Sequence, residues 1–395
     1  MRTTTSAAAR DANATTSTNR LYMSLELSLT TWKLGFTDGR AEPRVVSILA
    51  RGYSALGDAI AKARKRFSLA SDARVVSCYE AGREGFSVHR RLEEMGIDNR
   101  VVNPASIRVA RKARQSKTDR LDAVMLVKQL AAGELQALAV PSREVEDARQ
   151  VTRELHELKV ERGALANRIR GLLFAQGYDQ EVSTRAGRAE LELGRTDGTI
   201  KLLPHLSQRI TRELALLEKV ESQISEIEKA RVTALKAAAT RSHEQMRTLM
   251  TLCGIGIESA WTLVLELFGW RTFANRKKLA AFLGLTPTPF ASGKMNREQG
   301  ISKAGPVRLR SIMIELAWFW LRYQPDSDLS KWFNERFRGG TARTRRVGIV
   351  ALARKLLISL WHFLDDGKPP AGASIRSDRY AIKPKSRRKS ATLAA

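Results

Sequence analysis

Four acidic residues in the first third of the chain have the types and spacing to hold metal ions. Glu26 ends one expected strand and Glu80 directly follows another, so both can project from one edge of a sheet. Asp119 and Asp122 are three residues apart at the start of an expected helix and share one of its faces. Because Mg²⁺ and Mn²⁺ prefer oxygen ligands and bind phosphodiesters, the four acids predict a site for phosphoryl transfer.

Each acid also has a structural interpretation that involves no metal. Asp119 and Asp122 can stabilise the positive end of the helix dipole, with Ser116 or Thr118 as the N-cap. Glu26 can be an ordinary surface residue of a strand. The spacing by itself leaves both interpretations open.

A serine in the rear half of the chain is a candidate nucleophile. Ser292 is followed by Gly293 and Lys294, in a segment that we expect to be a flexible basic loop. Further cations that could contact phosphates follow along the chain: Lys303, Arg308 and Arg310. A serine can attack a phosphodiester if its proton is removed and the new charge is stabilised. Ser-Gly is also a common turn sequence, and the residues do not identify a general base.

A second candidate contact with nucleic acid is the sequence Gly254-Ile255-Gly256 between two expected helices. Bare backbone amides at such a turn can approach a phosphate, as in a helix-hairpin-helix element, which binds DNA without reading sequence. A plain tight turn between packed helices is the alternative. Residues 316–321 and Trp332-Phe333 are aromatic-rich, which favours helix core over base stacking. Arg338, Arg343, Arg345, Arg346 and Arg354 form either a nucleic-acid face or a solvated one.

Composition limits the class of protein. The 395 residues carry a formal net charge of +27 and are 43% hydrophobic, which predicts globular domains with a polyanionic partner. The two cysteines, Cys78 and Cys253, lie far apart and predict neither a disulfide framework nor a zinc site, so a reducing cytoplasm fits. We expect no membrane-spanning segment and no signal peptide.

Periodicity predicts an α/β domain, a helical arm and a helical rear region. In the front domain, strands are expected over residues 21–27, 32–37, 44–49, 74–79 and 100–103, and helices over 53–67, 84–95 and 118–132. Long helices over 144–175 and 206–239 form either a spacer within the chain or a dimer seam.

Several short motifs, in this order, resemble the DEDD transposase family of insertion sequences, relatives of the pilin-gene invertase Piv. The matching motifs are Tyr79-Glu80-Ala81-Gly82, Lys117-Thr118-Asp119-Arg120-Leu121-Asp122-Ala123, Gly254-Ile255-Gly256, Gly284-Leu285-Thr286-Pro287, Ser292-Gly293, Ile301-Ser302-Lys303-Ala304-Gly305 and Ala351-Leu352-Ala353-Arg354-Lys355-Leu356-Leu357. The resemblance extends over nearly residues 20 to 370.

The resemblance implies an RNase H-like (RuvC-like) α/β domain, a helical coiled-coil insertion and a mainly α transposase domain with a helix-hairpin-helix element. The expected boundaries are a disordered leader (1–20), the DEDD domain (21–143), the arm (144–245), the transposase domain (246–367) and a disordered basic tail (368–395). Carried over by motif, Glu80, Asp119 and Asp122 are metal ligands and Ser292 is the nucleophile that becomes linked to DNA. The family's first acid is usually aspartate, whereas this chain offers Glu26, which is one methylene longer.

The resemblance also implies a set of partners. These are donor and target DNA, a noncoding guide RNA encoded by the same element, and a homotetramer built as a dimer of dimers. The setting is the bacterial cytoplasm, in association with the nucleoid. Two rival functions remain: a Holliday-junction-type metal nuclease in which the acids alone activate water, and an inactive architectural protein that binds nucleic acid.

Overall fold

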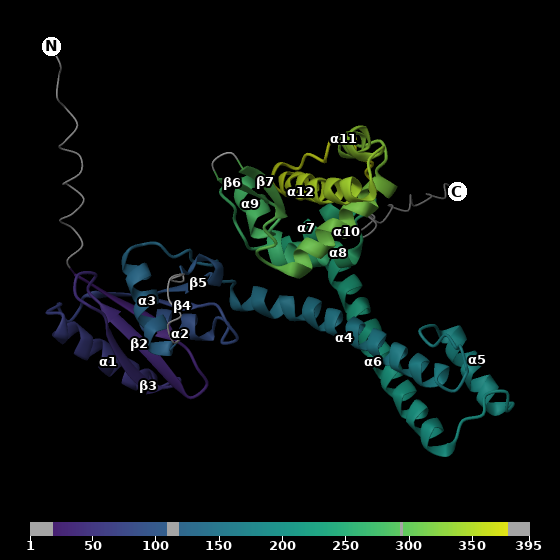
Figure 1. The fold of residues 1–395 in the computed structure, drawn as a ribbon, viewed down its shortest axis with the longest axis horizontal. Helices are drawn as coiled ribbons and strands as arrows, with labels where there is room; N and C mark the ends of the chain where they lie inside the picture. Colours follow the sequence, from purple (N-terminus) through teal and green to yellow (C-terminus); the bar gives the residue numbers. More distant parts are fainter. Residues whose placement is uncertain (1–18, 109–117, 293–294, 378–395) are drawn as a thin grey trace, which may run out of the picture. The chain divides into compact units, whose positions relative to one another are not determined.

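Alternating apolar residues near the N-terminus form a five-stranded mixed sheet (Figure 1). Its strands are β1 (Arg20–Glu26), β2 (Thr31–Thr37), β3 (Arg44–Leu49), β4 (Arg74–Glu80) and β5 (Asp98–Val102). They lie in the order β3-β2-β1-β4-β5, with β1, β2 and β3 antiparallel and β4 and β5 parallel to β1. This mixed sheet is consistent with the expected RNase H-like domain.

The computed structural model describes residues 19–108, 118–292 and 295–377, except the side chains of residue 105 and residues 289–299. The chain divides into two compact units, residues 1–140 and 141–395, which we call the front unit and the rear unit. The expected leader, up to residue 18, lies outside the described residues.

Helices cover both faces of the sheet in the front unit. The first face packs against α1 (Tyr53–Arg66) and α2 (Ser87–Glu94) through the odd-numbered residues of β1, such as Leu21, Met23 and Leu25. The second face is covered by α3 (Asp119–Ala131), which contributes Leu126 and Leu130 to a small core with Val76 and Cys78 of β4. A short helix, η1 (Pro104–Ser106), follows β5.

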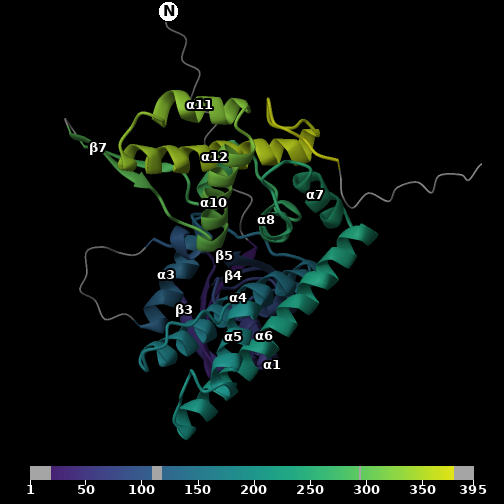
Figure 2. The same cartoon turned by 90° about the vertical axis from the view of Figure 1, so that its right-hand side faces the viewer.

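Two long helices form the arm of the rear unit and pair with each other. They are α4 (Arg143–Phe174) and α6 (Pro204–Ala237), and a shorter helix, α5 (Arg185–Thr196), lies between them in sequence (Figure 2). The ion pairs Lys159–Glu228 and Arg168–Glu213 show that α4 and α6 run antiparallel. The apolar stripe of α6, including Ile210, Leu217 and Ile224, is buried against α4 and α5 within the same chain.

The rest of the rear unit is mainly helical, as expected. Its helices are α7 (Arg241–Met250), α8 (Ile257–Leu263) with a continuing π-helical turn η2 (Val264–Phe268), α9 (Arg276–Phe282), α10 (Val307–Tyr323), α11 (Asp328–Phe337) and α12 (Ala342–Asp366). One large apolar core joins them.

Helix α12 departs from the expectation that no stretch is apolar enough to cross a membrane. Among the described residues, it alone has the length and composition of a membrane span, with a mean hydropathy of 1.6 in its most apolar window. It lies inside the rear core, however, where Leu352, Leu356 and Leu360 are fully buried against α10 and α11. Its composition therefore reflects burial on several sides.

The segment expected to be a flexible loop around Ser292 is instead a β-hairpin. Strands β6 (Pro287–Ser292) and β7 (Met295–Ile301) pair antiparallel, with an irregularity between Pro287 and Pro289. Strand β6 contains Pro287 and Pro289, and prolines cannot donate a hydrogen bond to a neighbouring strand. In a two-stranded ribbon both strands are edges, so a proline is tolerated where its nitrogen faces outward.

The first ten residues of the expected disordered tail, 368–377, have a defined structure. Residues 368–377 pack back onto the rear unit, where the Arg376 side chain donates to the carbonyls of Met250 and Ile255 at 2.8 Å. Ile375 forms a β-bridge with Leu252. The remaining basic residues, 378–395, lie outside the described part of the chain.

A buried ion pair attaches the arm to the core of the rear unit. Arg149 of α4 donates two hydrogen bonds to Glu266 of η2, at 2.6 and 2.9 Å, and Arg153 contacts the same carboxylate at 3.3 Å. Burial alone would raise the pKa of Glu266, but the hydrogen bonds and charges of the two arginines lower it overall. The pair therefore stabilises the fold in the ionised state of Glu266.

We expect Glu266→Gln to lower the free energy of unfolding at pH 7 by about 3 to 5 kcal/mol, because it leaves a buried guanidinium without its charge partner. Since folding lowers the pKa of Glu266, this contribution is present above the unfolded-state pKa of about 4.3 and is lost as the pH falls through the folded-state value. Urea unfolding followed by tryptophan fluorescence measures it. The exposed residue Glu192, which pairs with Arg195 on one turn of α5, provides the control Glu192→Gln. Equal effects of the two variants at pH 7 would contradict the assignment.

Candidate active site

The carboxyl ends of two neighbouring strands bring Glu26 and Glu80 side by side. Strands β1 and β4 are parallel, and Leu25 pairs with Tyr79, so the next residues along each strand are Glu26 and Glu80. Both lie on the face that α3 covers, because side chains alternate along a strand and Ser24 and Cys78 face α3. Glu26 is half-buried and Glu80 is exposed.

Two contacts fix the direction of α3 across this face. Ser24 Oγ donates a buried hydrogen bond of 2.6 Å to the carbonyl oxygen of Ala123. Further along the helix, Lys128 Nζ lies 2.9 Å from the carboxylate of Glu42, in the connection between β2 and β3. That connection is at the end of the sheet where β1 begins. Helix α3 therefore runs opposite to β1, and its first turn lies toward the end that carries Glu26 and Glu80.

The first turn of α3 carries Asp119 and Asp122, so all four candidate acids belong to one corner of the front unit. Thr118 is the N-cap, and its side chain accepts a hydrogen bond from the Leu121 amide. Both aspartates thus also stabilise the helix dipole, as the structural interpretation requires. The helix-dipole role of the two aspartates is compatible with a metal-ligand role, because a carboxylate that stabilises the dipole keeps oxygen atoms free for a cation.

A glycine and a serine that the sequence analysis did not single out allow α3 to approach the sheet this closely. A Cβ on Gly35 of β2 would lie 2.6 Å from Ser24 Oγ and 2.8 Å from the Ala123 carbonyl oxygen. The signals in the sequence were a glycine inside a strand, which marks close backbone approach, and a serine among apolar residues. Ser24 and Gly35 act as positioning residues for the aspartates of α3.

We expect Gly35→Ala to lower the stability of the front unit by about 1 to 3 kcal/mol, the usual cost of overpacking, and to reduce strand cleavage by displacing Asp119 and Asp122. Gly57 of α1 provides a matched control, since a Cβ there meets nothing within 4 Å. Gly57→Ala should be neutral or slightly stabilising. Hydrogen exchange of the α3 amides would report the displacement, and unchanged protection in Gly35→Ala would contradict this role.

The donor set at the corner fits a hard divalent cation. It consists of four carboxylates on adjoining elements, which is the ligand chemistry of Mg²⁺ and Mn²⁺. Within the described residues, no three acidic, histidine or cysteine side chains are gathered closely enough to hold a metal ion. Lys33 is the cross-strand neighbour of Glu26 and donates to Ser47 Oγ at 2.8 Å. Because the candidate carboxylates are not gathered closely enough, a cation at the corner requires them to move closer together.

Ser292 is the last residue of β6, opposite Met295 of β7. The hairpin places its backbone at the end of a strand, next to residues 293–294, so the candidate contact Lys294 lies outside the described residues. Lys303, just beyond β7, lines a cavity together with residues of α12. The position of Ser292 therefore depends on the β6–β7 pairing.

The two candidate arginines of α10 are used inside the rear unit. Arg308 donates to the carbonyl of Thr152 at 3.0 Å and lies 3.7 Å from Glu258. Arg310 donates to the carbonyl of Leu283 at 3.2 Å. These contacts favour structural roles for Arg308 and Arg310 over contacts with phosphates.

The Gly254-Ile255-Gly256 turn connects α7 to α8, and its two glycines differ. Gly254 has a φ of +93°, and a Cβ there would lie 3.3 Å from the Cβ of Tyr323 in α10. Gly254 is thus explained by the turn and its packing. Gly256 is exposed at the N-cap of α8, so its backbone is the part of the expected helix-hairpin-helix that a phosphate could reach.

Comparison with known sequences identifies the protein family of this chain. Residues 54–175 match a profile of the DEDD transposase domain, and residues 246–330 match a profile described as "Transposase IS116/IS110/IS902 family". A Sinorhizobium fredii protein named as a transposase, y4rJ, is 38% identical over 382 residues, which cover 90% of this chain and 95% of the relative. The chain belongs to the IS116/IS110/IS902 family of transposases.

More distant relatives are similar over most of their length. The transposase for insertion sequence element IS1111A of Coxiella burnetii is 26% identical over 70% of this chain and 74% of its own. The transposase for insertion sequence element IS1328 of Yersinia enterocolitica is 25% identical over 75% of this chain and 88% of its own. The protein is thus an insertion-sequence transposase, an enzyme of phosphoryl transfer on DNA.

The two matched segments divide the candidate residues of the transposase. The first contains Glu80, Asp119 and Asp122, and the second contains Ser292 and the Gly254 turn. Glu26 precedes both. A DEDD-type domain implies the use of divalent metal in general.

Proposed function

We propose that this transposase cuts and rejoins DNA strands with an acidic site in the front unit and a serine nucleophile in the rear unit. Glu26, Glu80, Asp119 and Asp122 would hold Mg²⁺ or Mn²⁺, and Ser292 would attack the phosphodiester. The observation that supports the proposal is that β1, β4 and α3 carry the four acids at the same end of the sheet. A bound divalent cation neutralises phosphate charge and stabilises the leaving oxygen.

The serine chemistry conserves the phosphodiester bond energy. Ser292 Oγ loses its proton to a base and forms a bond to phosphorus, while the bond from phosphorus to one deoxyribose oxygen breaks and that oxygen takes up a proton. The DNA is then linked to the protein as a phosphoserine ester. A hydroxyl at the end of another strand attacks the same phosphorus, which restores the serine and joins the strands.

The proposal includes partners that the family resemblance suggests. A guide RNA encoded by the element pairs with donor and target DNA, and a tetramer, a dimer of dimers, holds four strand ends together. Each composite site would combine one subunit's acids with another's Ser292. The +27 net charge supports binding of polyanions of either kind, in the bacterial cytoplasm at the nucleoid.

Strand exchange with purified protein tests the proposal. The reaction contains Mg²⁺, labelled donor and target DNA, and RNA transcribed from the element's flanks, with EDTA or omission of the RNA as controls. We expect joined donor–target product only when both metal and RNA are present. Exchange without RNA would contradict the guide. Cleavage without joining would favour a metal nuclease, and binding without cleavage would favour an architectural protein.

A further inference from the structure

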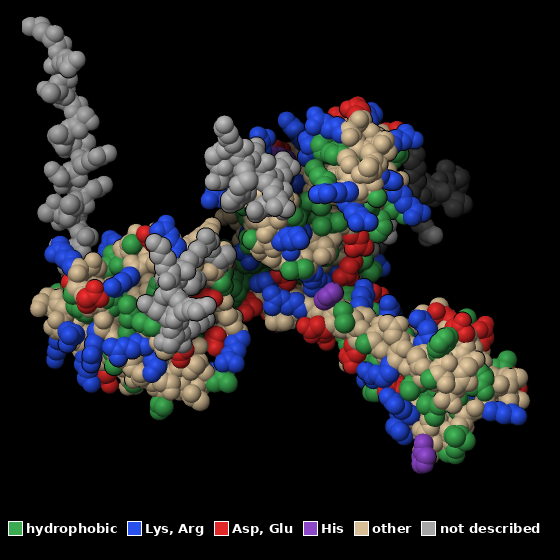
Figure 3. All heavy atoms as spheres, viewed as in Figure 1, with side chains coloured by type: hydrophobic (Ala, Val, Ile, Leu, Met, Phe, Trp, Pro, Cys, Tyr) green, Lys and Arg blue, Asp and Glu red, His purple; other side chains and the backbone are tan. Residues whose placement is uncertain are grey.

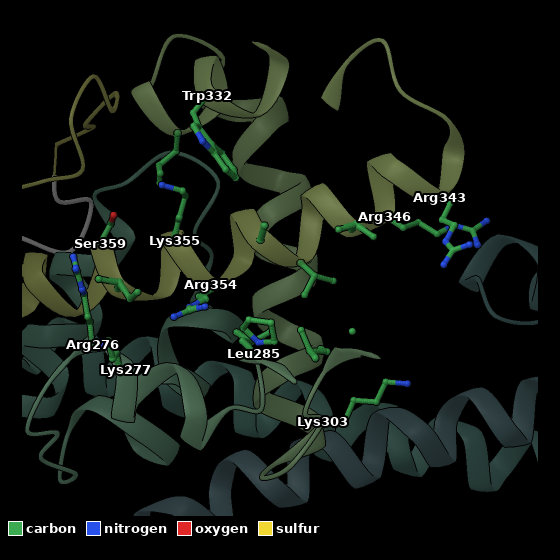
Figure 4. A pocket seen from close by; sticks show the side chains of 18 residues that line it. Arg276, Lys277, Leu285, Lys303, Trp332, Arg343, Arg346, Arg354, Lys355 and Ser359 are labelled. Carbon is green, nitrogen blue, oxygen red and sulfur yellow. The ribbon is translucent and has the colours of Figure 1, made fainter. Parts of the chain in front are cut away.

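A basic cavity of about 1020 Å³ lies in the rear unit (Figure 4). Its walls come from α9, the base of the β6–β7 hairpin, the residue Lys303 after β7, α11 and α12. The hairpin contributes Pro287 and Ile301, which pair with each other at the end of the ribbon opposite Ser292. The cavity therefore adjoins the element that carries the proposed nucleophile.

The cavity concentrates cations that the fold does not neutralise. Seven of its lining residues are lysine or arginine, and none of its described lining residues is acidic. None of the seven makes an ion pair within the described residues, whereas buried Arg149 and Arg231 of the same unit are paired with Glu266 and Glu258. In Figure 3, Lys and Arg side chains are also numerous around α11 and α12. Uncompensated cations at this density indicate an anionic ligand with several charges.

Helix α12 contributes four of these cations to the lining of the cavity. Arg343 and Arg346 extend together from one end of the helix, and Arg354 and Lys355 follow further along it (Figure 4). Arg354 follows Arg343 by eleven positions, a distance of about 16 Å along a helix. A row of this length can contact several successive phosphates of one nucleic-acid strand.

An aromatic side chain stands beside this row. Trp332 of α11 lines the cavity, and Lys355 Nζ lies 4.6 Å from its ring centroid (Figure 4). Much of the remaining wall is apolar, including Leu285, Leu329 and Val350. Aromatic rings next to a positively charged groove are the means by which proteins bind single strands, since every base has a face that can stack.

We propose that this cavity binds a single-stranded segment of nucleic acid, with its phosphates along α12 and an unpaired base stacked on Trp332. The inference deepens the proposed function, because cutting and joining expose unpaired strands that must be held near the serine hairpin. The base takes the place of Lys355 over the ring, and the ammonium group then contacts a phosphate. Bases of an intact duplex are already stacked on their neighbours and offer no free face to Trp332, so the site selects unpaired nucleotides without reading their sequence.

Fluorescence anisotropy with the full chain in EDTA tests this site without any cleavage. The probes are labelled eight-nucleotide single strands of DNA and of RNA, and a DNA duplex of the same sequence. We expect Trp332→Ala to weaken single-strand binding about tenfold and duplex binding less than twofold, while Trp332→Phe retains most of the affinity. The two single strands show whether the segment is DNA or RNA.

Charge removal gives an independent arm of the test. The slope of log Kd against log salt concentration for single-strand binding should be smaller by about 1.4 in the double variant Arg343→Ala/Arg346→Ala. Each lost phosphate contact accounts for about 0.7 of this decrease. Arg209 and Arg212 are exposed on the arm, and their double alanine variant removes the same charge as a control. Circular dichroism and photocrosslinking of a 4-thiothymidine strand to the α11–α12 peptide exclude misfolding as the cause. Wild-type affinity in Trp332→Ala, or equal losses for duplex and single strand, would overturn the proposal.

Because the assay needs neither metal nor Ser292, its failure is distinguishable from failure of the proposed chemistry. A protein that exchanges strands but binds oligonucleotides independently of Trp332 and α12 would retain the serine mechanism and lose this site. A protein that binds through the cavity but retains cleavage after loss of Ser292 would keep the site and lose the mechanism.

Discussion

Asp122→Asn is expected to lower the rate of DNA strand cleavage by about a thousandfold while leaving DNA binding within a factor of about two. Loss of a metal ligand removes several kcal/mol of transition-state stabilisation, and each 1.36 kcal/mol corresponds to a factor of ten in rate. The substitution keeps the shape of the side chain. It costs stability only through the helix dipole, by about 0.3 to 1 kcal/mol.

Single-turnover cleavage of a labelled substrate measures this effect. Asp58→Asn, on the exposed side of α1, removes the same charge from the same unit and should cleave at the wild-type rate. If Asp122 only stabilised the dipole of α3, both variants would cleave normally, and the metal interpretation of the corner would be wrong.

Ser292→Ala has the second of the two largest expected effects. Removing an enzyme's nucleophile lowers kcat by about 10⁶, so cleavage should fall below detection. DNA binding should persist, because the substitution removes only a hydroxyl at the end of β6. Ser302→Ala, in the same basic segment beyond β7, is the matched control and should cleave at the wild-type rate. Cleavage retained in Ser292→Ala would assign the chemistry to water and make the protein a metal nuclease.

The front unit could be predicted closely from the sequence because its signals are local. Alternating apolar residues marked β1, β2 and β3, and the acidic turn beginning at Asp119 marked the start of α3. Helix α5 was missed, since Gly187 and Gly194 lower its helix propensity. Packing against α6 overrides that propensity, with Arg188 bonded to Glu221.

The features that could not be predicted depend on residues far apart in the chain. The Ser24 hydrogen bond spans 99 positions, so its role in placing Asp119 and Asp122 appears only when α3 is folded onto the sheet. The basic cavity combines α9, the β6–β7 hairpin, α11 and α12, none of which marks a site alone. The sequence did identify Arg343, Arg346 and Arg354 as a candidate face. It assigned Trp332 to helix core, and the partly buried Trp332 does pack against the rear core while it also lines the cavity.

The central claim, that a serine of this transposase becomes covalently linked to DNA, is tested most directly by mass spectrometry of the trapped complex. The reaction with Mg²⁺, RNA and a nicked target strand that prevents rejoining is quenched in denaturant, treated with nuclease and protease, and analysed for modified peptides. We predict a nucleotide attached through phosphate to the peptide that contains Ser292, and none in Ser292→Ala. Cleaved DNA with no attached nucleotide, or a nucleotide on another residue, would contradict the account.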